Sequence, residues 1–299
     1  MGINAGAFLG ILLCGYLGEK VGWHYGFGLA GIFMFFGMLQ FYFAQGIFGS
    51  IGVKPTNKSN TSNSKEDTVK VSADANHKKI ERDRIFVIVI FSIATIFFWW
   101  AFEQAGGSMT IFANDYTDRQ LSGNSAVIFN TINTVITIVP MVVITYVLIK
   151  LFQNIFQSYF ISNFFLGLSF VIIWGIVIYM LNAEIGQETS EIPASWFSVL
   201  NSLFIILLAP VFSKIWASKY NPSGPIKFGI GLILLGVGYL FVAYGSLGIP
   251  AGAQTASVSV MWLVYAYLFH TLGELCLSPV GLSYVSKLAP ERLIGLMFG

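Results

Sequence analysis

The sequence predicts an all-α, polytopic membrane protein, and three observations support that class. The chain is 56% hydrophobic and only 10% charged, whereas ordinary soluble domains carry about 25% charged residues. Its mean hydropathy is +0.74. Eight apolar stretches are each long enough for the ~20 residues that cross the hydrocarbon core. They are residues 3–21, 26–48, 85–113, 125–152, 159–181, 193–217, 226–248 and 257–287.

The positions of the basic residues predict how the chain lies in the membrane. If residues 49–84 are cytoplasmic, fourteen of the sixteen Lys and Arg residues lie on that side, and only Lys20 and Arg119 lie on the other. Such a bias sets the orientation of membrane proteins. We therefore expect a multi-pass protein of the cell (inner) membrane. The net charge of +2 reflects this asymmetry and does not indicate nucleic acid as a partner.

A polar stretch divides the apolar spans into two groups. Residues 50–75 are mostly Asn, Ser, Thr, Lys and Asp and cannot bury a core, so residues 49–84 are expected to be a cytoplasmic linker. Residues 1–48 then hold two spans of an N-terminal helical bundle. Residues 85–299 hold an incomplete C-terminal bundle with an inserted helix pair at 125–181, which is expected to be peripheral and lipid-facing. Two bundles joined in this way are typical of transporters.

The last apolar run, residues 293–299, has under half the length that a membrane crossing needs. The chain is therefore expected to be a fragment.

The span at 85–113 carries an acid inside its apolar region. An ionised carboxylate there costs roughly 3 kcal/mol or more, so Glu103 is a candidate functional residue. Trp100 precedes it, and Gly106 and Gly107 follow it. Because glycines loosen a helix where it can bend, this span is predicted to combine a proton carrier with a gate.

A second acid, Glu274, lies near the middle of the last long span, with Pro279 close behind it. His270 precedes it by one helical turn on the same face. That histidine is interpreted either as a satisfied core residue or as a contact of Glu274.

Neither acid has an expected basic partner in this chain, because every Lys and Arg lies in a loop or at a membrane edge. Three partners remain for Glu103 and Glu274: a proton, a cationic group of a substrate, or basic residues outside this chain. All three are compatible with a proton-coupled carrier of amine-bearing solutes. The sequence contains no zinc-ligand pair, Walker loop or nucleophile with its base, so we expect no enzyme, no metal and no cofactor besides the coupling protons.

Asparagines inside the spans have two interpretations, because a buried amide needs a partner. Asn201 could form an interhelical hydrogen bond or contact a substrate. Asn130 and Asn133 could cross-link helices or line a pathway.

Five segments closely resemble the proton-dependent oligopeptide transporters of the major facilitator superfamily. They are residues 4–8, 15–27, 102–108, 192–197 and 273–283. The resemblance implies partial major-facilitator-like helical bundles, from the fifth family helix to the start of the eleventh, with two extra helices. It covers nearly the whole chain except the linker and residues 125–181. The extra pair departs from bacterial relatives, which commonly insert two helices between the bundles.

The resemblance also implies the site residues. Glu103 is similar to an acid that links proton binding to gating, and Glu274 to an acid that meets the amino terminus of the peptide. The implied substrate-binding residues are Glu274, Asn201, Asn4, Trp100, Gln104 and Ser278. Ser198 and Ser202 stand where relatives usually carry Gln and Pro, so the helix around Asn201 departs from the family pattern.

The expected function is proton-coupled symport of di- or tripeptides into the cell by alternating access. The expected partners are the peptide, protons, the lipid bilayer and the missing N-terminal helices of the full-length transporter. Two alternatives remain open. One is a major-facilitator carrier of another small amine- or carboxylate-bearing solute, and the other is a non-transporting membrane fragment whose acids only form interhelical hydrogen bonds.

Overall fold

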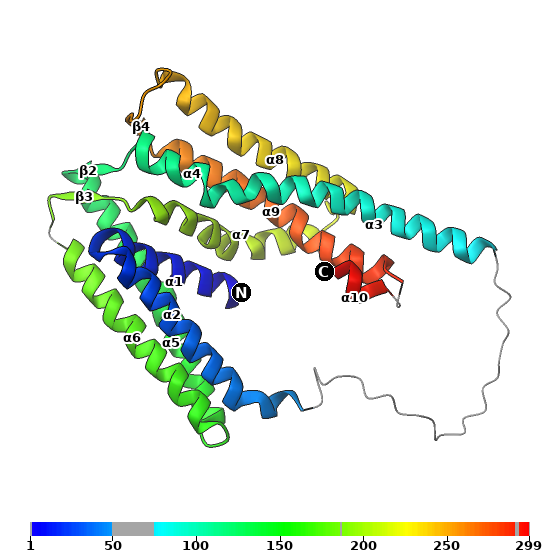
Figure 1. Ribbon diagram of the computed structural model, residues 1–299, viewed down its shortest axis with the longest axis horizontal. Helices are drawn as coiled ribbons and strands as arrows, with labels where there is room; N and C mark the ends of the chain where they lie inside the picture. Colours follow the sequence, from blue (N-terminus) through cyan, green and yellow to red (C-terminus); the bar gives the residue numbers. More distant parts are fainter. Residues whose placement is uncertain (1, 50–74, 186, 291–292, 299) are drawn as a thin grey trace.

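The computed structural model describes residues 2–49, 75–185, 187–290 and 293–298, and Figure 1 shows its helices. The α-helices are α1 (Gly2–Tyr16), α2 (Trp23–Ala44), α3 (Ala75–Phe102), α4 (Ser108–Ile111), α5 (Asn124–Ile155), α6 (Phe160–Glu184), α7 (Val199–Ala217), α8 (Gly224–Gly245), α9 (Met261–Leu288) and α10 (Ile294–Phe298). Shorter 3₁₀ or π turns extend several of them: η1 (Leu17–Val21), η2 (Gln45–Phe48), η3 (Glu103–Gly106), η4 (Phe112–Tyr116), η5 (Ala194–Ser198) and η6 (Ser246–Gly248).

Eight helical segments of the described residues are long and apolar enough to span a membrane. They coincide with the eight predicted spans to within a few residues, apart from an earlier start and later end of the third. The all-α class and the multi-pass membrane character are thus confirmed.

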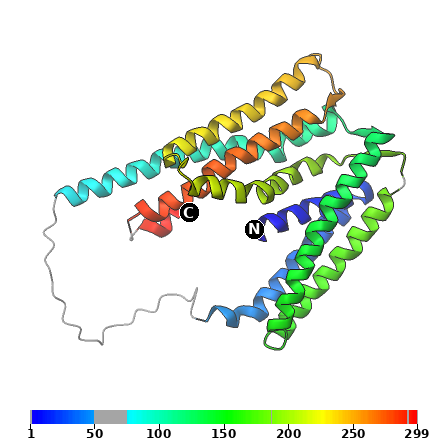
Figure 2. The ribbon, with the colours of Figure 1, turned by 180° about the vertical axis from the view of Figure 1, so that it is seen from behind.

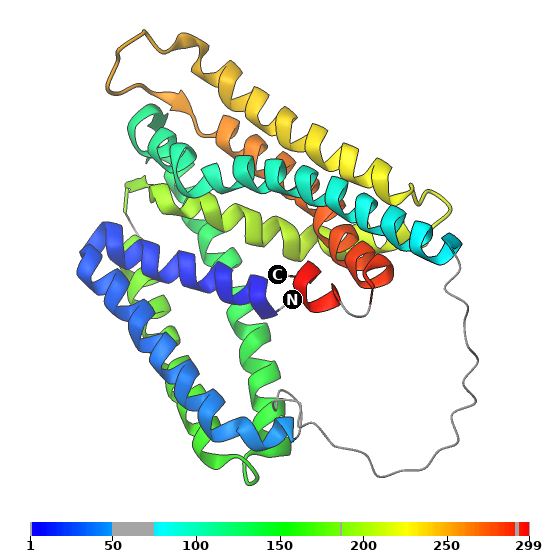
Figure 3. The same ribbon diagram turned by 45° about the vertical axis from the view of Figure 1, so that its right-hand side comes forward.

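The helices form two groups, which the three views separate clearly (Figures 1–3). In one group α3, α8 and α9 share a core around Phe98, Leu235 and Leu277. In the other, α1, α2, α5 and α6 share a core that includes Phe8 and Met141. The α7 segment contributes to the second core, and it also packs against α9. Thus α7 joins the two groups.

Glycines bring α8 and α9 into close contact. A Cβ atom on Gly273 would lie 2.7 Å from the carbonyl oxygen of Gly231, and a Cβ on Gly231 would lie 2.9 Å from the carbonyl oxygen of Gly273. Small residues allow such close backbone approach between membrane helices. This contact fixes α9, which carries Glu274, against α8.

The inserted pair α5–α6 packs on the first two helices rather than within the group formed by α3, α8 and α9 (Figure 3). The hydroxyl of Ser162 on α6 donates to the carbonyl oxygen of Gln40 on α2 at 3.2 Å, and Phe165 stacks on Phe43. Many outward side chains of α5 are exposed, such as Val143 at 56%. Its position in the sequence had suggested that the pair belongs to the C-terminal bundle, and the packing differs from that expectation.

Residues 50–74 of the expected linker lie outside the described residues. Residues 75–84, also expected to be linker, form the first turns of α3 instead.

Four short strands in the described ranges close one end of the bundle and were not predicted. β1 (Thr117–Asp118) pairs in parallel with β4 (Val258–Ser259), and β2 (Gln120–Ser122) pairs antiparallel with β3 (Thr189–Glu191). The second ladder brings the end of the α3–α4 span next to the start of η5 and α7.

Candidate functional site

Glu103 lies where the third span changes its helical geometry. α3 ends at Phe102, Glu103 is the first residue of the 3₁₀ turn η3, and Gly107 then takes φ −117° and ψ −100° before α4 begins. The predicted loosening at Gly106 and Gly107 is confirmed. The Glu103 side chain is exposed at this break.

Hydroxyl groups of neighbouring helices bond the carbonyl groups around this break. Tyr239 on α8 donates to the carbonyl oxygen of Ala101 at 2.5 Å. The carbonyl oxygen of Ala105 accepts from Thr110 at 2.9 Å and from Tyr267 of α9 at 3.4 Å. Because an irregular turn leaves carbonyl groups without their usual helical partners, these bonds stabilise the break inside the span.

Glu274 lies half-buried on α9 and bonds across to α7. Its Oε2 accepts a 3.3 Å hydrogen bond from Nδ2 of Asn201. Oδ1 of Asn201 in turn accepts a 2.6 Å bond from the hydroxyl of Thr271, one turn before Glu274. Asn201 therefore forms an interhelical hydrogen bond, and its partner is the predicted substrate-binding acid.

The hydroxyl of Thr271 has one proton and two acceptors within reach, because the carbonyl oxygen of Tyr267 is 2.7 Å away. With an ionised Glu274, which only accepts, the bonds run from Thr271 through Asn201 to Glu274. When Glu274 is protonated, the bonds can run in the opposite direction if the Asn201 amide turns over. Glu274 then donates to the Asn201 oxygen, the Asn201 NH₂ donates to the Thr271 hydroxyl, and Thr271 donates to the carbonyl oxygen of Tyr267. The chain of bonds can thus serve both states of the acid.

Neither Glu103 nor Glu274 is paired with a basic residue among the described residues. In the described part of the chain, the ion pairs join Lys20 and Arg119 to Glu191, and neither acid is among them.

The other predicted site residues form no hydrogen bond with Glu274 in the part of the chain that the structure describes. Trp100 is 69% exposed, and Gln104 accepts a 3.1 Å bond from the hydroxyl of Ser108. Asn4 is half-buried and Ser278 is exposed. No hydrogen bond joins any of these four to Glu274 or Asn201 in the described ranges.

His270 is a core residue but not a satisfied one. It is 1% exposed, and neither ring nitrogen has a hydrogen-bond partner among the described residues. Its ring packs 4.6 Å from that of Tyr239, next to Gly238, where a Cβ would collide with it. The interpretation as a contact of Glu274 is therefore not supported by the geometry.

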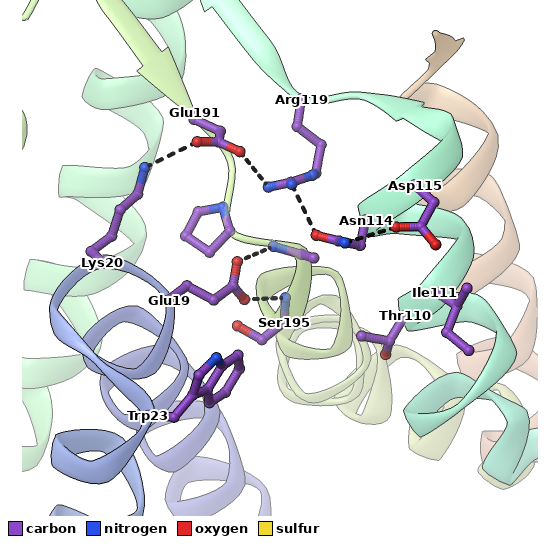
Figure 4. Close-up of a pocket in the computed structure, with 12 residues that line it drawn as sticks. Glu19, Lys20, Trp23, Thr110, Ile111, Asn114, Asp115, Arg119, Glu191 and Ser195 are labelled. Atoms are coloured by element: carbon purple, nitrogen blue, oxygen red, sulfur yellow. Dashed lines mark hydrogen bonds and ion pairs between the residues drawn. The ribbon is translucent and has the colours of Figure 1, made fainter. Parts of the chain in front are cut away.

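A cavity of about 530 Å³ lies at the end of the bundle near the short strands, away from Glu274. Figure 4 shows Lys20 and Arg119 on either side of Glu191. Arg119 pairs with Glu191 at 2.9 Å and donates to the carbonyl oxygen of Ile192 at 2.7 Å and to Oδ1 of Asn114 at 3.1 Å. These charges are largely paired with each other.

Glu19 connects the end of the first helix to the start of the η5–α7 segment at this cavity. Its two carboxylate oxygens each accept a 2.8 Å bond, from the backbone N–H groups of Ala194 and Ser195 (Figure 4). These N–H groups open the η5–α7 segment, and a carboxylate at a helix start is favourable. Sequence reasoning did not single out Glu19, Arg119 or Glu191 as site residues. The signal that could have found them is that Lys20 and Arg119 are the two basic residues predicted to lie on the side opposite the linker.

The chain is similar to known proteins over most of its length. The model of the POT family matches residues 1–72 and 172–299, and so leaves out the stretch with Glu103, α3 and α5. Peptide transporter YePEPT of Yersinia enterocolitica is 29% identical over 353 residues, covering 100% of this chain and 56% of the relative. The di-/tripeptide transporter of Lactococcus lactis subsp. cremoris is 29% identical over 304 residues, covering 97% of this chain and 55% of the relative.

A crystal structure of a mutant of the peptide transporter POT in complex with alafosfalin is 26% identical. The similarity covers 100% of this chain and 55% of that one, with a TM-score of 0.50. This chain thus spans about half the length of the curated relatives it matches. The matched family consists of transporters, which agrees with the expectation that the chain is not an enzyme. From the family match over both of its helical groups, the chain belongs to the POT family.

Proposed function

We propose that this chain is part of a carrier that brings di- or tripeptides into the cell together with protons, by alternating access. Glu274 binds the amino terminus of the peptide, and Glu103 takes up and releases the proton. The observation that carries the proposal is the position of Glu274. It lies half-buried between two helices, bonded to Asn201 and without a described cation.

A protonated amine suits this position. A carboxylate inside a span is costly when it stays ionised and unpaired, and an ammonium group supplies both a positive charge and three hydrogen-bond donors. Asn201 occupies only one oxygen of Glu274, so acceptor capacity remains for the substrate. Asn4, Trp100, Gln104 and Ser278 are proposed to line the path of the peptide.

The helix break at Glu103 supports a coupling role. A proton on Glu103 removes a negative charge from inside the third span, where an ionised carboxylate is costly. Because Glu103 is the first residue of η3, its protonation changes the charge at the point where the helix can bend. Protons are the only coupling ion proposed, and no other cofactor is needed.

The names of the relatives support peptides as the substrate class, since YePEPT is a peptide transporter and the Lactococcus relative a di-/tripeptide transporter. Basic residues of N-terminal helices outside this chain are proposed to meet the peptide carboxylate. We place the protein in the cell (inner) membrane with residues 49–84 on the cytoplasmic side, because most basic residues lie there.

The test is uptake of a labelled dipeptide by the full-length protein in liposomes under an inward proton gradient. We expect uptake above that of empty liposomes. An unlabelled dipeptide should compete with the labelled one more strongly than an amino-blocked dipeptide does. Glu274→Gln should reduce this preference for the free amine. No uptake by folded protein would favour the carrier of another solute, and an unchanged preference in Glu274→Gln would rule out the amine-binding role.

A further inference from the structure

Thr271 connects the proposed substrate acid to the helix that carries it. Its side chain is fully buried, at 0% exposure. Its hydroxyl lies 2.7 Å from the carbonyl oxygen of Tyr267, within the same helix, and 2.6 Å from Oδ1 of Asn201 on α7. Thr271 itself has no hydrogen bond to Glu274 among the described residues, so any effect on the acid passes through Asn201.

The two ends of the Asn201 side chain are not equivalent. An ionised Glu274 can only accept hydrogen bonds, so Asn201 must turn its NH₂ group toward it. The amide oxygen then points the other way and needs a donor. Thr271 is the only donor to that oxygen in the described part of the chain.

Loss of the Thr271 hydroxyl would leave the Asn201 carbonyl oxygen without its partner. The side-chain amide would then be held only by its bond to Glu274 and could rotate away from it. Glu274 would lose the donor that holds its Oε2 and with it a fixed orientation toward a substrate amine.

We propose that Thr271 is a positioning residue of the peptide site, whose hydroxyl orients the Asn201 amide so that Glu274 is held for the amine. The proposal rests on the proposed function, in which Glu274 binds the peptide amino terminus. It adds a residue that none of the sequence motifs marks as part of the site.

Two substitutions distinguish the contribution of the Thr271 hydroxyl from that of its packing. Thr271→Val keeps the shape and removes the hydroxyl, whereas Thr271→Ser keeps the hydroxyl and removes a methyl group. In the full-length protein we expect Thr271→Val to raise the KM for a dipeptide by about five- to tenfold, the loss of roughly one hydrogen bond. The maximal rate should stay within about twofold, because the chemistry of Glu103 is not touched.

The control is Thr95→Val. Thr95 donates to the carbonyl oxygen of Phe91 one turn earlier, at 2.8 Å, just as Thr271 does to Tyr267. No interhelical acceptor of Thr95 is found among the described residues. We expect Thr95→Val to keep the wild-type KM and Thr271→Ser to stay within about twofold of it. Affinity for an amino-blocked dipeptide should not change in any of the three variants.

A wild-type KM in Thr271→Val would overturn the inference, and so would an equal defect in Thr271→Ser, which would indicate packing. If Thr271→Val does not fold, Thr271→Cys, with its weak donor, should show the same rise in KM. Glu274→Gln in the same assay distinguishes failure of the positioning role of Thr271 from failure of the proposed function. If Glu274→Gln abolishes the preference for a free amine while Thr271→Val keeps the wild-type KM, only the positioning role fails. If Glu274→Gln leaves that preference intact, the proposed function fails as well.

Discussion

The carboxylate of Glu19 accepts a 2.8 Å hydrogen bond from the backbone N–H of Ala194, 175 residues later in the chain. A second 2.8 Å bond from Ser195 makes the contact bidentate. Glu19 follows α1 in the first helical pair, and Ala194 opens the segment that continues as α7. The start of α7 is thus capped by a side chain from another helix, and the first helical pair is tied to the segment that carries Asn201.

Glu19→Gln should destabilise the protein, because it replaces a charged acceptor at a helix start by a neutral group that can accept at only one atom. Hydrogen bonds to charged groups contribute about 1.5–3 kcal/mol, so we expect a loss of about 1 kcal/mol in the free energy of unfolding. Thermal unfolding of the purified protein in detergent measures it. Glu188→Gln, an exposed glutamate with no side-chain bond among the described residues, is the control and should match wild type. Equal stability of the two variants would show that the cap is not significant.

Arg119 should matter far more than Lys20, although both pair with Glu191. The Arg119 side chain is 13% exposed and also bonds Ile192 and Asn114, whereas Lys20 is 30% exposed and lies 3.6 Å from Glu191. Arg119→Lys keeps the charge but cannot reach all three acceptors, and we expect a loss of about 1–3 kcal/mol. Lys20→Gln should cost less than about 0.5 kcal/mol. Chemical or thermal unfolding of both variants compares them, and the reverse order of stability would contradict the geometry.

Gly273→Ala should be strongly unfavourable, because its new Cβ would lie 2.7 Å from the backbone oxygen of Gly231. Relief requires α8 and α9 to separate, at a cost of about 1–3 kcal/mol. Gly236→Ala on α8 is the control, since nothing lies within 4 Å of its Cβ, and alanine favours a helix. The fraction of monodisperse protein after heating distinguishes the variants. A Gly273→Ala protein as stable as Gly236→Ala would mean that the two helices are not in close contact there.

The eight spans could be predicted from the sequence because hydropathy alone defines the length that crosses a membrane. Glu103 and Glu274 could be singled out for the same reason, as acids within apolar surroundings. The bend after Glu103 followed from Gly106 and Gly107. In each case the information lies within a few residues of the feature.

The contacts of Glu19 and Arg119 could not be predicted, because their partners lie far along the chain. Arg119 donates to the carbonyl oxygen of Ile192, which lies 73 residues later in the chain, and no local sequence pattern specifies that contact. The short strands and the packing of α6 on α2 depend on the same long-range arrangement. For His270, the apolar helix pattern correctly predicted burial, but its expected hydrogen-bond partner is absent among the described residues. The polar composition of residues 75–84 suggested a linker, whereas α3 begins at Ala75 and extends through them.

The measurement that tests the proposed function most directly is uptake by Glu103→Gln in liposomes, in two modes. Gln keeps the shape of Glu103 but cannot cycle a proton, so we expect loss of uptake driven by a proton gradient while exchange of internal for external dipeptide continues. Wild-type driven uptake by Glu103→Gln would contradict the proton-coupling role of Glu103.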